Sequence, residues 1–339
     1  MPSSSSSRRR RGRSGGRHAA DETETRNWAE LPLDAILTIL HKLDHVDILM
    51  GPGQVCRSWR GAARDEPELW RRINMLGHAD LENELNLHGM AQAAVRRSAG
   101  RCEAFWGEYA RDHDFLFYLA DQAPSLKSLR LISCYDRLTE AIMKFHLLEE
   151  LELSLCPNVN DSGVFGVIGK ACPQLKRFRL SKDVFCDFEA SVYGKDEEAL
   201  GIATMHELRS LQLFGNILTN KGLTAILDNC RHLESLDIRH CFNVTMDDAL
   251  RAKCAMISTL MLPNDSTDDY DLVVKSPIRA DSESFLHDYM GSCSDYELGS
   301  EDYGDYCDLS RYLDGVYEDE DELDEEGKMI LGGMRMFMK

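Results

Sequence analysis

The stretch LESLDIRHCFNV, Leu233 to Val244, decides the fold of this chain. Its apolar residues follow the spacing L-x-x-L-x-L, and a cysteine comes three positions after the last of them. The same spacing occurs five more times between residues 126 and 264. Because the pattern repeats at a fixed phase, it predicts a stack of similar structural units and not one isolated chemical site.

Six units with this spacing define the length of the array. Their first residues are separated by 22, 27, 33, 25 and 24 positions, compared with roughly 20–29 in leucine-rich repeats. The longest interval contains the charged sequence SVYGKDEEALGI, residues 191–202, which we interpret as a loop insertion on one face. A degenerate unit near Cys102 and Phe105 is expected to cap the array. The first residues of the six units are Leu126, Leu148, Leu175, Leu208, Leu233 and Ile257.

Each unit predicts a short strand that turns its leucines inward and sends the intervening residues to a concave face. One unit cannot bury its apolar side alone, whereas stacked neighbours can. We therefore predict an α/β solenoid of about six to seven strand–helix units, over residues 76–264.

The expected concave face combines charged residues with two apolar side chains, Ile132 and Phe214. This mixture favours binding of a protein segment, although a merely solvated sheet face is the alternative interpretation. Ser154, Ser181 and Met261 belong to the same alternation. The candidate target-binding residues are Arg130, Ile132, Glu152, Arg177, Arg179, Gln212, Phe214, Asp237 and Arg239.

The cysteines follow the repeat. Four units place a cysteine or asparagine in the turn after the strand, and three more cysteines end the connecting helices. Metal binding requires clusters such as C-x-x-C, which the sequence lacks. We predict that these thiols pack in the core and satisfy buried backbone groups, with no nucleophile and no metal among their roles. The two sets are Cys134, Cys156, Asn216 and Cys241, and then Cys172, Cys230 and Cys254.

A compact helical module precedes the repeats. Within the 46 residues from Trp28 to Ile73, apolar residues recur at the spacing of one helix face, and Pro32 suits the first turn of that helix. So small a core is marginal alone, so we expect the module to lean on its neighbour. The apolar residues of the predicted helix face are Ile36, Ile39, Leu40 and Leu43.

This module resembles an F-box across its full length. The matching elements are Leu31-Pro32 with Ile36-Leu37, then Val55-Cys56-Arg57-Ser58-Trp59, then Glu68-Leu69-Trp70, which supply the "LP…IL", "VCRSW" and "ELW" signatures. The sequence departs from that pattern at Gly51-Pro52-Gly53, just before the Val-Cys helix, where Pro52 is tolerated if the helix begins there. An F-box followed by repeats with this cysteine phase is the arrangement of the F-box/LRR-repeat family, and residues 94–131 look most like its plant members.

The resemblance covers residues 28–264 and implies a substrate receptor of a Skp–cullin–F-box ubiquitin ligase. The F-box binds the Skp adaptor through an apolar face, the repeats bind a protein target, and the chain itself carries no catalytic residue and no cofactor. A conjugating enzyme held elsewhere on the ligase then transfers ubiquitin to the target, so that the chain acts by proximity. The adaptor-binding residues that the resemblance implies are Leu31, Pro32, Ile36, Leu37, Leu40, Ile48, Val55, Cys56, Trp59 and Trp70.

Three other functions remain as alternatives. An interaction scaffold that no longer recruits a ligase is supported by the Gly51-Pro52-Gly53 departure. An enzyme is disfavoured because the sequence has no Gly-rich phosphate loop after a strand, no H-E-x-x-H and no G-x-S-x-G. A hormone-binding receptor is disfavoured because the array is short and no pocket motif can be matched.

The two ends of the chain differ in composition from the body. Residues 1–26 are rich in Ser, Arg and Gly and are expected to be disordered; their arginine run suits a nuclear-import signal, a weak RNA-contacting arm or a solvated tail. Neither a signal peptide nor an apolar run of transmembrane length occurs. We therefore expect a nuclear or cytoplasmic protein with reduced thiols and no membrane partner.

The acidic charge is concentrated in the C-terminal tail. Residues 265–326 hold 22 acidic and 3 basic residues, a net charge of −19 that equals the charge of the whole chain. Phosphates are repelled by such a tail, so nucleic-acid binding is not expected. The domain organisation is therefore a basic tail over 1–26, an F-box over 27–75, the solenoid over 76–264 and a mostly disordered acidic tail over 265–339. Occlusion of the basic Arg177 and Arg179 by this tail is a hypothesis; deletion of 265–339 should then raise target binding most at low salt.

Overall fold

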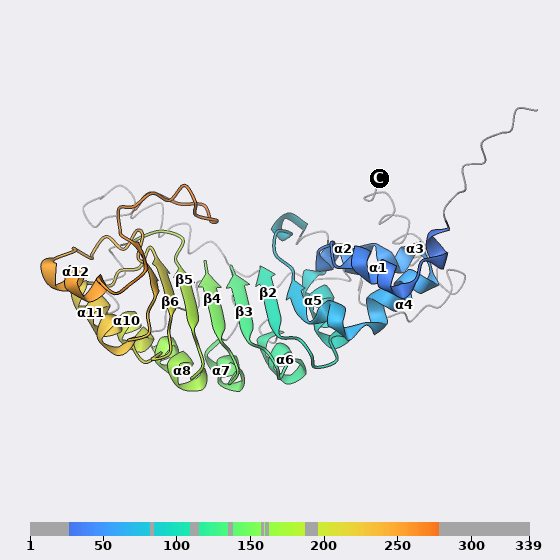
Figure 1. Ribbon diagram of the computed structural model, residues 1–339, viewed down its shortest axis with the longest axis horizontal. Helices are drawn as coiled ribbons and strands as arrows, with labels where there is room; N and C mark the ends of the chain where they lie inside the picture. Colours follow the sequence, from blue (N-terminus) through green and yellow to red (C-terminus); the bar gives the residue numbers. More distant parts are fainter. Residues whose placement is uncertain are drawn as a thin grey trace, which may run out of the picture.

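The computed structural model describes residues 27–81, 85–108, 115–134, 138–156, 159, 163–186 and 196–277. In these residues a small helical module is followed by an arc of parallel strands with helices along its outer side (Figure 1). The predicted α/β architecture of a helical module and a repeat solenoid is thus confirmed. The basic tail and residues 278–339 lie outside the described residues. Within the described ranges, no helix is both long enough and apolar enough to cross a bilayer.

The helical module is built from short helices with defined ends. Pro32 is the N-cap of the first α-helix, as its fixed φ favours. The carboxylate of Asp44 accepts a hydrogen bond of 2.8 Å from the backbone N–H of Asp47 and so caps the second helix. The helices are η1 (Trp28–Glu30), α1 (Leu33–Leu40), α2 (His45–Met50), α3 (Pro52–Val55), α4 (Arg57–Asp65) and η2 (Pro67–Trp70).

The repeat region forms one parallel sheet whose strands lie side by side in chain order. Each strand from β2 to β7 pairs with the strands of the preceding and following units, so the apolar faces of neighbouring units join into a continuous core. The strands are β1 (Arg72–Asn74), β2 (Ala104–Glu108), β3 (Ser128–Ile132), β4 (Glu150–Ser154), β5 (Arg177–Ser181), β6 (Ser210–Phe214), β7 (Ser235–Asp237) and β8 (Thr259–Met261).

Helices connect the strands along the outer side of the arc (Figure 1). Their packing is close: a Cβ on Gly201 would lie 2.7 Å from the Cβ of Phe165 on the neighbouring helix, so only glycine fits there. The connecting helices are η3 (Ala79–Leu81), α5 (Leu87–Arg97), α6 (Phe115–Gln122), α7 (Leu138–Ala141), η4 (Ile142–Lys144), α8 (Gly163–Ala171), α10 (Glu197–Ile202), α11 (Asn220–Asn229) and α12 (Asp248–Cys254).

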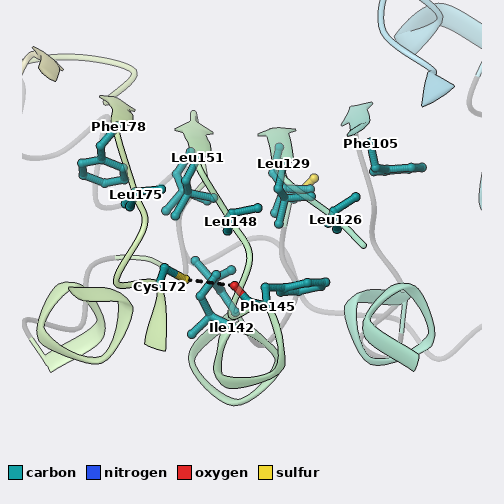
Figure 2. Packing of buried hydrophobic residues seen from close by; sticks show 14 of the residues in the cluster. Phe105, Leu126, Leu129, Ile142, Phe145, Leu148, Leu151, Cys172, Leu175 and Phe178 are labelled. Atoms are coloured by element: carbon teal, nitrogen blue, oxygen red, sulfur yellow. Dashed lines mark hydrogen bonds between the residues drawn. The ribbon is translucent and has the colours of Figure 1, made fainter. Parts of the chain in front are cut away.

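The repeated leucines form ladders on the side of the sheet that faces the core. Leu129 on β3 pairs in register with Leu151 on β4, which pairs with Phe178 on β5 (Figure 2). All three are buried, and burial of each such side chain contributes about 1.5–3 kcal/mol. The prediction that the leucines of each unit point inward is therefore confirmed.

The turns that hold the first predicted Cys and Asn set are built in the same way. Leu155, Gly215 and His240 have positive φ angles of 56°, 66° and 59°, and each directly precedes a Cys or Asn of the first predicted set. The thiol of Cys241 donates to the backbone oxygen of Leu213 over 3.3 Å, and burial raises its pKa to about 12. The predicted role of this set, satisfaction of buried backbone groups in the turn, is confirmed.

The second set of cysteines closes the connecting helices. The thiol of Cys172 donates to the backbone oxygen of Phe145 over 3.6 Å (Figure 2), and that of Cys230 donates to Met205 over 3.4 Å. Burial raises the pKa of Cys172 to about 12 and that of Cys230 to about 11. Thiols with such pKa values stay protonated at neutral pH, as packing groups do.

The charged stretch at 191–202 differs from the sequence interpretation. Its second half forms the regular connecting helix α10, and residues 187–195 lie outside the described residues. Asp196 accepts hydrogen bonds from the backbone N–H groups of Thr219 at 2.8 Å and Gly222 at 3.1 Å, at the start of α11. The interpretation of the whole stretch as a loop insertion was wrong for residues 196–202. The carboxylate of Asp196 caps α11, and Ala199 and Ile202 of α10 are buried.

The helical module and the sheet share one core. The fully buried Trp70 ends η2, and β1 begins two residues later, inside the range that the sequence assigned to the F-box. His45 joins the two parts: its Nδ1 accepts a hydrogen bond from the backbone N–H of Asn74, and its Nε2 lies 3.2 Å from the backbone oxygen of Leu69. The expectation that the module leans on its neighbour is confirmed.

Candidate functional site

A group of apolar side chains stays uncovered on the helical module. Trp28, Leu33 and Val55 are 54%, 49% and 53% exposed, and Pro32 is exposed beside them. The indole N–H of Trp59 on α4 donates to the backbone oxygen of Trp28 over 3.0 Å, which fixes η1 against the helix that follows Val55. Uncovered apolar groups of this kind mark a binding surface. We call Trp28, Pro32, Leu33 and Val55, with the half-buried Leu31, Leu37 and Cys56, the module surface.

The structure divides the ten predicted adaptor-binding residues into two groups. Five of them, Leu31, Pro32, Leu37, Val55 and Cys56, belong to the module surface. The other five point into the chain's own core, and this corrects their assignment to an adaptor contact. The resemblance matches the positions of apolar residues but does not show which of them face the core, which explains the error. The five core residues are Ile36, Leu40, Ile48, Trp59 and Trp70.

Trp28 and Leu33 were missed in the sequence. Leu33 directly follows the Leu31-Pro32 pair, and it is the first residue of α1, so its side chain lies at the exposed end of the helix. Trp28 precedes the pair on η1. The signal that was available is the position of both residues next to Leu31-Pro32, within one turn on either side.

The departure at Gly51-Pro52-Gly53 is accommodated in the structure. Pro52 is the first residue of α3, where its missing N–H leaves no hydrogen bond unmade, and its side chain is buried. The expected Val-Cys helix is interrupted, however: α3 ends at Val55, Cys56 is extended, and α4 begins at Arg57. The guanidinium of Arg60 donates to the backbone oxygen of Gly53 over 2.8 Å and so links the two helices.

A row of polar residues crosses the concave face because the strands pair in register. Glu152 on β4 lies between two arginines of this row, with Arg130 Nε at 2.8 Å and Arg179 Nε at 3.6 Å from its carboxylate oxygens. Further along the row, the amide of Gln212 donates to Asp237 over 3.0 Å. The residues of the row, from β3 to β8, are Arg130, Glu152, Arg179, Gln212, Asp237 and Met261.

The second row carries the predicted apolar residues. Ile132, Ser154, Ser181 and Phe214 pair in register from β3 to β6. Ile132 is only 6% exposed and Phe214 only 2%, which corrects the expectation of two exposed apolar side chains. Phe214 is covered on one side by His240, whose ring centroid lies 4.7 Å away, and on the other by Tyr270.

The predicted basic residues Arg177 and Arg179 lie on the same face of β5, two positions apart along the strand. Arg177 pairs with Glu150 on β4, whereas Arg179 lies in the row of Glu152 and Gln212. Arg239, just after β7, is nearly fully buried, and its Nη2 lies 2.8 Å from a carboxylate oxygen of Asp237. The arginines of the concave face are therefore held in place by carboxylates of the same face.

Residues 265–277 turn back from β8 over the concave face (Figure 1). Asp271 accepts from Arg130 Nη2 over 2.9 Å and from Arg179 Nη1 over 3.0 Å, and Lys275 Nζ pairs with Asp183 over 2.6 Å. The hydrogen bond from Arg179 holds the pKa of Asp271 below its usual value. The sequence placed all of 265–339 in one mostly disordered tail, whereas the segment 265–277 contacts the strands β3, β5 and β6 and the loops after β5 and β7.

Comparison with known proteins supports the division into a module and repeats. An F-box-like family model matches residues 28–76, and a Leucine Rich repeat model matches residues 204–227 and 229–241. The F-box protein SKIP19 of Arabidopsis thaliana is 38% identical over 315 residues, which cover 90% of this chain and 97% of that protein.

Two further proteins of Arabidopsis thaliana are similar over most of this chain. Putative F-box/LRR-repeat protein 22 is 38% identical over 83% of this chain and 90% of its own length. Putative F-box/LRR-repeat protein 23 is 40% identical over 73% of this chain and 56% of its own length. The similarity thus extends over both the module and the repeats.

Proposed function

The chain belongs to the F-box/LRR-repeat family, and we propose on that basis that it is the target-binding subunit of a Skp–cullin–F-box ubiquitin ligase. In this role the module surface binds a Skp-type adaptor, and the concave face of the solenoid binds the protein to be ubiquitinated. The observation that carries the proposal is the module surface itself. Its Trp28, Leu33 and Val55 are each about half exposed, whereas the residues Ile36, Leu40, Ile48 and Trp70 of the module core are buried.

The chemical contribution of the chain is proximity. A conjugating enzyme held elsewhere on the ligase transfers ubiquitin to a lysine of the target, and the chain raises the local concentration of that lysine. This function requires two binding surfaces on one rigid body and no reacting group of the chain. The shared core around Trp70, Ile73 and His45 supplies the rigid connection between the surfaces.

The proposal is tested by co-purification of the full chain with a Skp adaptor. We expect the wild type to retain the adaptor and the variants Leu33→Asp and Val55→Asp to retain at least ten-fold less, because a carboxylate in an apolar contact is left without a partner. Leu200→Asp is the matched control: Leu200 is 50% exposed on α10, on the outer side of the solenoid, and this change should not affect adaptor binding.

Two results would contradict the proposal. One is a wild-type chain that is folded by circular dichroism yet retains no adaptor, which would favour an interaction scaffold. The other is equal loss of adaptor in all three variants, which would show that the effect does not come from the module surface.

A further inference from the structure

Tyr270, the central residue of the sequence Asp269-Tyr270-Asp271, lies on the concave face, where both its ring and its hydroxyl are in contact with the protein. Its ring stacks on that of Phe214, with centroids 4.1 Å apart, and its hydroxyl lies 2.6 Å from the hydroxyl oxygen of Ser181. The guanidinium carbons of Arg179 and Arg239 lie 5.1 and 5.4 Å from the centroid of the tyrosine ring. Stacking, cation–π contact and a hydrogen bond to the phenol together recognise all parts of one side chain.

The two flanking carboxylates have arginine partners on the same surface. Asp269 pairs with Nη1 of Arg239, and Asp271 is shared by Arg130 and Arg179. The backbone contributes as well, because Arg239 Nη1 also donates to the carbonyl oxygen of Ser266 over 2.9 Å. Each arginine of the surface thus contacts one of the flanking carboxylates.

Carboxylates of the surface itself hold its arginines in place. Glu152 fixes Arg130 and Arg179, and Asp237 fixes Arg239, so the floor holds three guanidinium groups with two carboxylates. The remaining positive charge suits an acidic ligand, and groups fixed in advance lose little conformational entropy on binding. Arginines held in place in this way favour a binding surface over a merely solvated sheet face.

We propose that this surface recognises an aromatic residue flanked by carboxylates in the protein target, and that residues 269–271 occupy it in cis as a competitor. We call the surface the Tyr270 site and define it by Arg130, Arg179, Ser181, Phe214 and Arg239. The inference rests on the proposed function for the identity of the ligand as a ligase target. It specifies which part of the concave face binds the target and which side chains the target supplies.

The chain contains a second copy of this short motif. Asp295-Tyr296-Glu297 repeats the order acid, tyrosine, acid.

The segment of residues 269–271 competes with a target because it is tethered to the site, at an effective concentration of about 1 mM. If its separate dissociation constant is about 0.1 mM, it lowers the apparent affinity for a target about ten-fold. A target with several contacts on the solenoid overcomes such a competitor.

The test uses a fluorescein-labelled peptide of sequence DSTDDYDLVVKSP, residues 265–277, and the full chain. In one variant, Tyr270→Ala with Asp271→Asn, the cis contacts of Tyr270 and the charge of Asp271 are removed, and we call this chain the emptied variant. We expect this variant to bind the peptide by fluorescence anisotropy at least ten-fold more tightly than the wild type, whose site is occupied. A peptide with alanine in place of its tyrosine should not bind, and binding should weaken at high salt.

A matched pair of arginine substitutions locates the binding. In the same emptied variant, Arg179→Ala should reduce peptide affinity at least ten-fold. Arg177→Ala is the control, because Arg177 lies two residues away on β5 and pairs with Glu150 instead of the segment. Thermal unfolding of both variants checks that the fold is kept.

The inference is decided by the peptide affinities of two emptied variants and of the two arginine substitutions. The second emptied variant carries Tyr296→Ala as well, so that the motif around Tyr296 cannot fill the site. If neither emptied variant binds the peptide better than the alanine peptide, or if Arg177→Ala and Arg179→Ala weaken binding equally, the inference is overturned. Because no adaptor is present, peptide binding without adaptor co-purification would overturn the proposed function alone, and the reverse result would overturn the inference alone.

Discussion

The ring of Tyr270 lies nearly parallel to that of Phe214, with an angle of 20° between the two planes. The two residues are far apart in the sequence, and the contact holds the segment after β8 against β6. Because burial raises the pKa of Tyr270, its phenol is neutral at physiological pH and can share a hydrogen bond with Ser181. When Tyr270 leaves this contact, nearby residues of the segment should become more accessible to solvent and to proteases, so their accessibility measures whether the Tyr270 site is occupied.

Tyr270→Ala should expose the peptide bond after Lys275 to trypsin. Removal of the ring leaves the segment with its ion pairs and the hydrogen bond from Arg239 to Ser266, and ion pairs whose carboxylates are exposed are weak. We expect cleavage after Lys275, identified by mass spectrometry, to be at least ten-fold faster than in the wild type. Asp268→Asn, in the same segment, should leave the rate unchanged. Equal rates in Tyr270→Ala and the wild type would show that the stacking does not hold the segment.

Lowering the pH should destabilise the joint between the helical module and the sheet. Burial lowers the pKa of His45, while its Nδ1 accepts from Asn74 and must be unprotonated. The unfolded chain therefore binds more protons than the folded one between the lowered pKa and the ordinary value of about 6.5, and stability falls as the pH drops through this window.

This pH effect is measured as the change in Tm between pH 7.5 and pH 5.5. His45→Gln should be less stable than the wild type at pH 7.5 and should show a smaller change in Tm. His240, whose pKa is also lowered by burial, is unchanged in both proteins, so the difference reports on His45. A change of the same size in both proteins would rule out His45 as the group responsible.

Gly215→Ala and Gly166→Ala should have opposite effects on stability. Gly215 has a positive φ of 66° in the turn after β6, so alanine there should cost about 1 kcal/mol. Gly166 is in the middle of α8 and a Cβ would contact nothing within 4 Å, so alanine should add about 0.5–1 kcal/mol. Chemical denaturation of both variants measures the two changes. Destabilisation by both would contradict the helical role of Gly166.

Asp196→Ala should destabilise the chain by about 1–2 kcal/mol, because it removes the acceptor for the first N–H groups of α11. Asp196→Asn should lose less, since its amide oxygen can still accept. The free energy of unfolding from urea titrations distinguishes the two variants. Equal stability of the wild type and Asp196→Ala would show that water replaces the cap without cost.

The leucine ladder was the most predictable part of the fold. A spacing that repeats six times fixes both the inward direction of Leu129 or Leu151 and the parallel order of the strands. The helix face of the module was less predictable: Ile36 and Leu40 share the periodicity of Leu33 and Leu37, and periodicity alone does not show which side of the helix is packed. Only the position of α4 against α1 decides this.

The Tyr270 site could be predicted only in part. Arg130, Arg179 and Phe214 were assigned to the concave face by alternation, which the strand register supports. The hypothesis that the acidic tail occludes Arg177 and Arg179 named the tail but not the segment, because Asp269-Tyr270-Asp271 belongs to a stretch whose acidity is typical of disorder. The contact of a few residues with a prearranged surface leaves no signal in the average charge of a segment.

The common core of module and sheet fixes the distance between the module surface and the concave face. Neighbouring strands are about 4.8 Å apart, so β5 lies about 19 Å from β1 across four steps. Since His45 and Trp70 join β1 to the module without a flexible linker, a ligand over Arg179 is held at a set distance and direction from Leu33 and Val55. If the chain has the proposed function, the strand on which a target binds determines which lysines of the target come within reach of the transferring enzyme, in steps of one strand spacing.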